Sequence, residues 1–226
     1  LCDSLCAVNP DVVFVASALN DHLRAEQNWY ASSDLSFVEY GALQLLDERF
    51  GGCRELSGFN VALFRALGIP CGIDRVVQNP HRIGSHMWTF MVDTNGRKLP
   101  YLWNYYNIDR EERMEEKYGK VYRDYFSVQT TNWAVSYPDE DIPGILKKPF
   151  LRDVSDEYFG RNVAVVPLYD SAGDGRLCYL AVFNNAGWSP VAVGTAAGFQ
   201  GVFNNIDTAI VYLPVYHREG KLTAAG

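Results

Sequence analysis

The amino-acid sequence predicts an α+β protein with a helical beginning, a central antiparallel hairpin and an all-β end. Apolar residues recur at helical spacing through the first third of the chain, and the spacing becomes strand-like after about residue 70. Beyond about residue 150, short apolar runs alternate with clusters of Gly, Asn and Asp. The 226 residues are enough for two small domains. We expect a first domain over residues 1–135, a linker over 136–152 and an antiparallel β domain over 153–226.

Two helices are predicted before residue 51. The first covers residues 10–29, where five apolar residues have helical spacing: Val12, Val13, Ala16, Leu19 and Leu23. The second begins near Ser36, which forms a capping-box pattern with Glu39. It runs to about Phe50 and is ended by the two glycines that follow.

A third helix is predicted to begin at or near Cys53 and to end at Gly68-Ile69-Pro70. Its residues are apolar on nearly every side, which is typical of a buried central helix. Gly68 suits a left-handed cap, and Pro70 prevents the helix from continuing.

Strands follow this helix. We expect them over residues 71–77, 86–93 and 99–106, with Asn95-Gly96 as a two-residue turn that pairs His86 with Tyr105. A charged helix is expected over residues 111–118. The β domain is predicted to be a small antiparallel sandwich. Its expected strands cover residues 163–168, 177–183, 190–193, 201–203 and 209–215.

Composition excludes several functions. A net charge of −7 without a Lys/Arg cluster argues against a nucleic-acid partner. No stretch reaches the roughly 18 apolar residues of a membrane-spanning helix. The five cysteines are too few and too scattered for a disulfide framework, although Cys2 and Cys6 could pair or share a helical face. No ligand cluster at a recognised spacing predicts a metal, and no cofactor is expected.

Cys53 is a candidate nucleophile. It follows two glycines and opens a buried helix, where unpaired N–H groups and the helix dipole favour a thiolate and could bind a developing oxyanion. The alternative is a small apolar residue that begins a helix. We expect Cys71 and Cys178 to be of that inert kind, because both lie in apolar strand sequence.

His86 is the candidate base. It begins a predicted strand on which His86, Trp88 and Phe90 share a face, and a base on a rigid strand can be held against a helix N-terminus. The alternative is a structural or surface histidine. The other three histidines are assigned to that class: His22, His81 and His217.

These motifs resemble those of transglutaminase-like domains, which are related to papain. The resemblance rests on a Cys-led helix after Gly52, its Arg65-Ala66-Leu67-Gly68-Ile69-Pro70 end, and the His86-Met87-Trp88 strand, in that order. It implies a fold in which the Cys-led helix packs on an antiparallel sheet, with Cys53 and His86 as catalytic residues.

Further segments are similar to a Bacteroidetes-type group of exported proteins, many of them lipoproteins, which implies a location in the periplasm or at the cell surface. These segments are Asp74, Asn79-Pro80, Lys120-Val121-Tyr122-Arg123, Tyr179-Leu180-Ala181-Val182-Phe183 and Val211-Tyr212-Leu213-Pro214.

The third catalytic residue departs from the family pattern. The family places an Asp near the position of Leu102, and Asn104 is the nearest side chain that could accept the imidazole N–H. With the ideal two-residue turn Asn104 would face away from His86, unless Pro100 forces a bulge that changes the register. Asp93 has the wrong parity and lies about 20 Å along the strand from His86.

Two functions from different classes follow. The first is a thiol-dependent hydrolase or acyl transferase that acts on an amide bond of a peptide, protein or glycopeptide, with Trp88, Trp103 and Tyr105 contacting the substrate. The second is a non-catalytic peptide- or glycan-binding protein that keeps the fold with an incomplete triad. In that case Tyr101 would join the same aromatic surface. The direction of the Asn104 side chain would discriminate between them.

Overall fold

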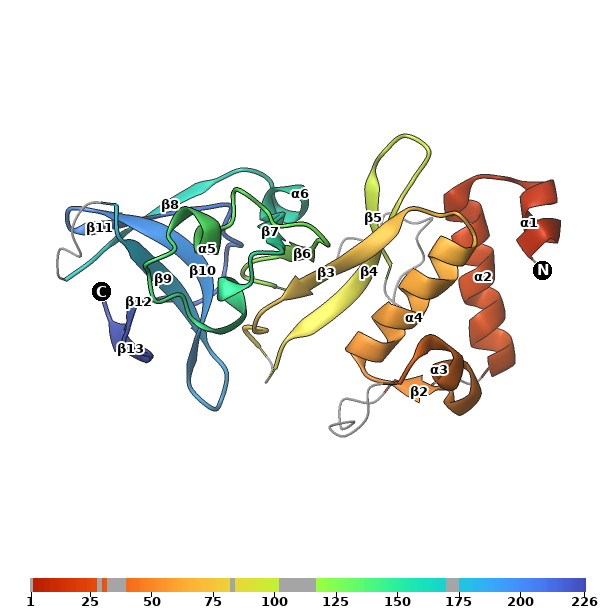
Figure 1. Cartoon of the computed structure of the whole chain (residues 1–226), viewed down its shortest axis with the longest axis horizontal. Helices are drawn as coiled ribbons and strands as arrows, with labels where there is room; N and C mark the ends of the chain where they lie inside the picture. The colour runs from red at the N-terminus through yellow and green to blue at the C-terminus, as the bar shows by residue number, and fades with distance from the viewer. Residues whose placement is uncertain (1, 28–29, 32–39, 82–83, 102–116, 170–174) are drawn as a thin grey trace. The chain divides into compact units, whose positions relative to one another are not determined.

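A computed structural model describes residues 2–27, 30–31, 40–81, 84–101, 117–169 and 175–226 (Figure 1). Its contacts divide the chain into two units. The first comprises Leu1–Asp74 and Met87–Glu115, and the second comprises Arg75–His86 and Glu116–Gly226. The boundaries at residues 135 and 153 stay a prediction. No helix in the described ranges is long and apolar enough to cross a membrane.

Four helices are described in the first unit: α1 (Cys2–Val8), α2 (Val12–Gln27), α3 (Ala42–Glu48) and α4 (Cys53–Ala66). The predictions for α2 and α4 are confirmed, and α1 was not predicted. The capping pair Ser36 and Glu39 lies outside the described residues. After α3, the short strand β2 (Phe50–Gly51) pairs in parallel with β1 (Tyr30–Ala31).

Helix α4 supplies the centre of the first core. It buries Leu56, Phe59 and Phe64, which cluster with α2 and with Met91 and Tyr101 of the sheet. In Figure 1 the orange helix α4 lies along strands β3 and β4, with α2 beyond it. The helix ends as predicted: Gly68 adopts φ +74°, and the Ile69 N–H donates to the Phe64 carbonyl at 2.9 Å.

Three neighbouring strands follow in the order β5-β4-β3: β3 (Cys71–Val76), β4 (His86–Val92) and β5 (Lys98–Tyr101). The division into units falls after Asp74 within β3 and after His86 within β4. The predicted two-residue turn is wrong. Val92 pairs with Lys98 and Thr89 with Tyr101, and the Asp93 N–H donates to the Arg97 carbonyl. The loop therefore has three residues and ends in Gly96 at φ +79°. The register shifts by one residue from the predicted one.

The second unit contains a six-stranded antiparallel sheet in the order β13-β12-β9-β10-β11-β8. Its strands are β8 (Val163–Pro167), β9 (Leu177–Phe183), β10 (Trp188–Ala197), β11 (Gln200–Asn204), β12 (Leu213–Arg218) and β13 (Lys221–Ala224). The predicted start of β12 at residue 209 is four residues early, and β13 was not predicted. The sheet curls so that its two edges approach each other. The Tyr169 N–H, just after the edge strand β8, donates to the Ala225 carbonyl, just after the opposite edge strand β13.

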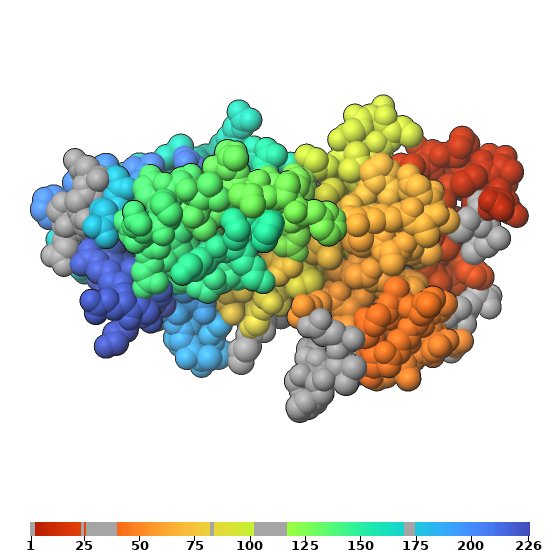
Figure 2. Space-filling model, viewed as in Figure 1, coloured from red at the N-terminus to blue at the C-terminus, as the bar shows by residue number. Residues whose placement is uncertain are grey.

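Strand β9 is buried on both faces. Cys178, Leu180 and Val182 join one core cluster, and the alternate residues Leu177, Tyr179 and Ala181 join another. The second cluster is closed by residues from the segment that precedes the sheet in sequence. In Figure 2 this green segment covers much of the blue strands on the face in view.

That covering segment contains β6 (Tyr122–Asp124), α5 (Trp133–Ser136), the 3-10 turn η2 (Gly144–Lys147), β7 (Leu151–Asp153) and α6 (Ser155–Phe159). It includes the range 136–152 that we expected to be a linker, in which Ile142, Leu146 and Leu151 are buried. Residues 102–116, where a helix over 111–118 was expected to begin, lie outside the described residues.

Gly194 provides a test of the second core. A Cβ atom there would lie 2.4 Å from the Val202 carbonyl oxygen and 2.5 Å from the Phe203 ring. We expect Gly194→Ala to lower the free energy of unfolding by about 1–3 kcal/mol, because backbone and a buried ring must move. Urea denaturation followed by circular dichroism measures this.

Gly58→Ala is the control for this test. A Cβ at this exposed position in α4 meets nothing within 4 Å, so we expect stabilisation of about 0.5–1 kcal/mol. Equal stability of Gly194→Ala and the unmodified protein would contradict the packing described for Phe203.

Candidate functional site

The beginning of α4 is fixed by Gly51, Gly52 and Glu55. Gly52 is the residue before the helix, and its N–H donates to a Glu55 carboxylate oxygen at 3.0 Å. A Cβ on Gly51 would lie 2.9 Å from a methyl group of Leu45 and 3.0 Å from the Glu55 Cβ. Gly51 therefore has a packing role, because a larger residue would collide with α3 and α4. Cys53 is thereby held as the first residue of the helix.

A second tie joins the first turn of α4 to β4. The buried Ser57 hydroxyl lies 2.6 Å from the Cys53 carbonyl oxygen and 3.3 Å from the Met87 carbonyl oxygen. Two residues after Met87 on β4, the Thr89 hydroxyl is 3.3 Å from the Ser57 carbonyl oxygen. Sequence reasoning missed Ser57, because its contact with β4 is made to the Met87 carbonyl, 30 residues further along the chain. The helix start that carries the thiol is therefore anchored to the strand that begins at His86.

Cys53 differs in its surroundings from Cys71 and Cys178. Its side chain is partly exposed at the helix start. Cys71, in β3, is also partly exposed, but burial raises the pKa of its thiol. Cys178 is fully buried in β9, and burial raises the pKa of its thiol to about 12. These two positions agree with the inert role that the sequence predicts for them.

His86 is the first residue of β4 and is partly exposed. The loop before it is closed by the Asn79 N–H, which donates to the Gly84 carbonyl at 2.9 Å, with Gly84 at φ +96°. Two of the remaining histidines, His22 and His81, are exposed. His217 lies in β12, where its Nδ1 is 2.7 Å from the Asp141 carbonyl. A surface or structural role fits all three.

The aromatic residues expected to contact a substrate are placed differently from one another. Trp88 is buried in β4 with 1% of its surface exposed, so it is a packing residue in this structure. Tyr101 is also 1% exposed and donates its hydroxyl to the Asn20 side-chain oxygen at 3.0 Å, which corrects its assignment to a surface. Trp103, Asn104 and Tyr105 lie outside the described residues.

Asp93 is committed to the hairpin turn. Its carboxylate accepts the N–H groups of Asn95 at 2.9 Å and Arg97 at 2.7 Å, and the Arg97 Nε at 2.6 Å. The hydrogen bond from the Arg97 side chain holds the pKa of Asp93 below its usual value. Asp93 thus stabilises the end of β4 opposite to His86. Within the described ranges, no group of three or more His, Cys, Asp or Glu side chains is placed to hold a metal ion.

Comparison with known families finds a match for the part of the chain that contains both candidate residues. The family model of the transglutaminase-like superfamily matches residues 5–103, which span Cys53 and His86 and end one residue before Asn104. No curated protein and no solved structure matches the chain.

The contrast among the thiols predicts their order of alkylation. We expect iodoacetamide at pH 8 to modify Cys71 and Cys178 more slowly in the folded protein than after unfolding, because only the thiolate reacts and a raised pKa lowers its fraction. Peptide mapping by mass spectrometry measures each site. Equal rates at Cys178 in the folded and unfolded states would contradict its burial.

Proposed function

We propose that the transglutaminase-like domain, to which residues 5–103 belong, is the catalytic part of a thiol-dependent hydrolase or acyl transferase acting on amide bonds. The proposal assigns Cys53 as the nucleophile and His86 as the base. The observation that carries it is the Ser57 tie. One buried hydroxyl lies within hydrogen-bonding distance of the carbonyls of Cys53 and Met87, the residue next to His86.

In the proposed reaction the Cys53 thiolate attacks the carbonyl carbon of an amide, and the oxyanion that forms faces the N–H groups at the start of α4. His86 donates its proton to the leaving amine, and a thioester remains on Cys53. Water, with its proton taken by His86, then releases a carboxylic acid. A primary amine in place of water gives a new amide bond. The proposal covers both acceptors.

Asn104 is proposed to orient His86. In the described part of the hairpin, Val92 pairs with Lys98 and Thr89 with Tyr101, so each step back along β4 matches one step forward along β5. A regular ladder continued from this register would pair Asn104 with His86, and cross-strand partners share a face. The predicted two-residue turn would have put Asn104 on the other face. The observed three-residue loop thus supports Asn104 as the third member.

The substrate class proposed is a peptide, protein or glycopeptide. Trp103 and Tyr105 are proposed contacts for it, since they flank Asn104 in sequence. The buried Trp88 is assigned to packing within β4. Export to the periplasm or cell surface is also part of the proposal and rests on the resemblance of the sequence to an exported group.

The pairing of Cys53 and His86 is tested by alkylation at different pH values. We expect Cys53 to react with iodoacetamide at pH 6 at a rate well above that of Cys71, and His86→Ala to slow this reaction about tenfold or more, because an imidazolium stabilises the thiolate. His81→Ala is the matched control, since this exposed histidine lies five residues earlier. Equal rates in all three proteins would favour the non-catalytic binding alternative.

The chemical step is tested with fluorescent casein for hydrolysis and with incorporation of a fluorescent primary amine into casein for transfer. We expect one of the two signals from the unmodified protein and a loss of at least about 10³-fold in Cys53→Ala, because the acyl-enzyme can no longer form. Cys71→Ala controls for general effects of losing a thiol. Activity that persists in Cys53→Ala would exclude this residue as the nucleophile.

The role of Asn104 is tested by comparing Asn104→Ala with Asn104→Asp. We expect the alanine variant to lower kcat about 10-fold to 100-fold with little change in KM, because the imidazole loses its orientation but the substrate keeps its contacts. Asp retains an acceptor at the same position and should keep most of the activity. Full activity in both variants would show that Asn104 is not part of the site.

A further inference from the structure

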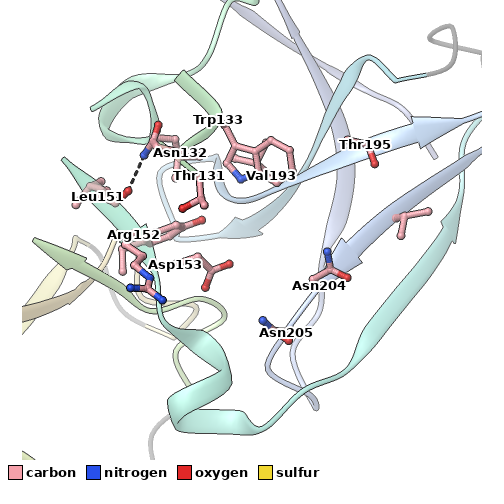
Figure 3. A pocket seen from close by; sticks show the side chains of 13 residues that line it. Thr131, Asn132, Trp133, Leu151, Arg152, Asp153, Val193, Thr195, Asn204 and Asn205 are labelled. Atoms are coloured by element: carbon pink, nitrogen blue, oxygen red, sulfur yellow. Dashed lines mark hydrogen bonds between the residues drawn. The ribbon is translucent and has the colours of Figure 1, made fainter. Parts of the chain in front are cut away.

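The second unit contains a cavity of about 260 Å³ that the proposed reaction does not use. It lies between the outer face of β10 and β11 and the segment that carries α5 and β7 (Figure 3). All the residues that line it belong to the second unit. Neither Cys53 nor His86 is among the residues that line it.

The cavity has an apolar floor and a polar rim. The floor consists of the core residues Tyr122, Leu146, Leu151 and Val193, together with the partly exposed Val202, and Trp133 is packed against the same core cluster. In Figure 3 the rim is formed by side chains from several elements around the open space: Thr131, Arg152, Asp153, Thr195, Asn204 and Asn205. A ligand that fits has an apolar face and polar edges.

Within the described ranges, most of the rim side chains have no hydrogen-bonding partner in the protein itself. In the part of the chain that the structure describes, no hydrogen bond or ion pair is made by the side chains of Thr131, Arg152, Thr195, Asn204 and Asn205. These side chains come from three separate parts of the chain: the turn before α5, strand β7 and the β10–β11 hairpin. Converging amides and hydroxyls offer both donors and acceptors to a ligand.

The frame that supports these side chains is fully bonded. The Lys120 ammonium, buried in the protein, contacts the Asp153 carboxylate and the carbonyls of Asn204 at 2.8 Å and Asn205 at 3.2 Å. The Asn132 amide donates to the Leu151 carbonyl at 2.7 Å and to the Lys148 carbonyl at 3.1 Å. Rigid support of this kind holds the free rim groups in place before a ligand arrives.

The strands beneath the cavity cannot accept another strand. Strand β10 is hydrogen-bonded to β9 on one side and β11 on the other, and β11 is bonded to β10 and β8. At Thr195 and Val202, which pair with each other and with β9 and β8, both strand edges are occupied, so an extended peptide cannot add to the sheet there. A ligand must bind through side chains alone. The small volume also argues against drug-sized ligands, whose pockets measure about 300–1,000 Å³.

We propose that this cavity is a binding site for one ring of a neutral saccharide. A sugar ring has an apolar C–H face that matches the floor and the Trp133 side, and hydroxyl groups that both donate and accept hydrogen bonds along the rim. The charges of Lys120 and Asp153 compensate each other, and the exposed guanidinium of Arg152 offers N–H donors to ring hydroxyls. The second unit thus binds glycan, whether or not Cys53 and His86 carry out the proposed reaction.

The experiment uses the indole N–H signal of Trp133 in ¹H–¹⁵N spectra of the whole chain, assigned with Trp133→Phe. The probes are the methyl glycosides of glucose, galactose, mannose and N-acetylglucosamine. We expect at least one of them to shift the Trp133 signal saturably and to leave that of Trp188 unchanged. Thr195→Val should weaken the apparent affinity about five- to tenfold, because one rim hydrogen bond is lost.

Thr223→Val is the matched control, since Thr223 is exposed on β13 at the opposite edge of the sheet. Asn204→Ala, also exposed, repeats the test should Thr195→Val fold poorly. Cys53→Ala should bind the glycoside as the unmodified protein does, which separates this proposal from the catalytic one. A Trp133 signal that no glycoside shifts, or that acetylated dipeptides alone shift, would overturn the proposal.

Discussion

Ser57 lies where helix α4 meets strand β4, and its hydroxyl contacts the carbonyls of Cys53 and Met87 inside a core with little water. Moving the helix start by one residue would take the buried Ser57 hydroxyl away from the Met87 carbonyl, at a cost of about 1–3 kcal/mol if the hydroxyl or the carbonyl is left unpaired. The position of α4 along the sheet is therefore set by polar contacts, and its apolar residues alone would tolerate sliding. The same contacts therefore fix the position of the partly exposed Cys53 thiol at the helix start.

The elements with strong local signals were predictable from sequence. Helix α4 follows from its apolar residues and its Gly68-Ile69-Pro70 end, and β9 follows from an apolar run bounded by turns. The hairpin register was not predictable, because Asn95-Gly96 favours a two-residue turn. The carboxylate of Asp93 instead bonds the N–H groups of Asn95 and Arg97 and widens the loop. A side chain that outcompetes the local turn preference decides the register.

The candidate site was predictable in its residue types but incompletely in its support. Cys53 and His86 stand out because few chemistries need a thiol at a helix start and a histidine at a strand start. Ser57 was missed because a serine within an apolar helix carries no signal until its strand partner is known. The rim of the second-unit cavity was missed for a similar reason. Thr131, Arg152, Thr195 and Asn204 are separated by many residues and become neighbours only when the segment before the sheet folds over it.

Strand β9 is buried on both faces and hydrogen-bonded on both edges, by β10 and β12. Its amide hydrogens can reach water only when the layers on both sides separate, so their exchange with deuterium would report global unfolding of the second unit and no smaller opening. Val193, which lines the cavity floor, pairs with Tyr179 of this strand. The floor of the cavity is thereby tied to the slowest-exchanging part of the unit, and so is Thr195 of the rim, which pairs with Leu177 of the same strand.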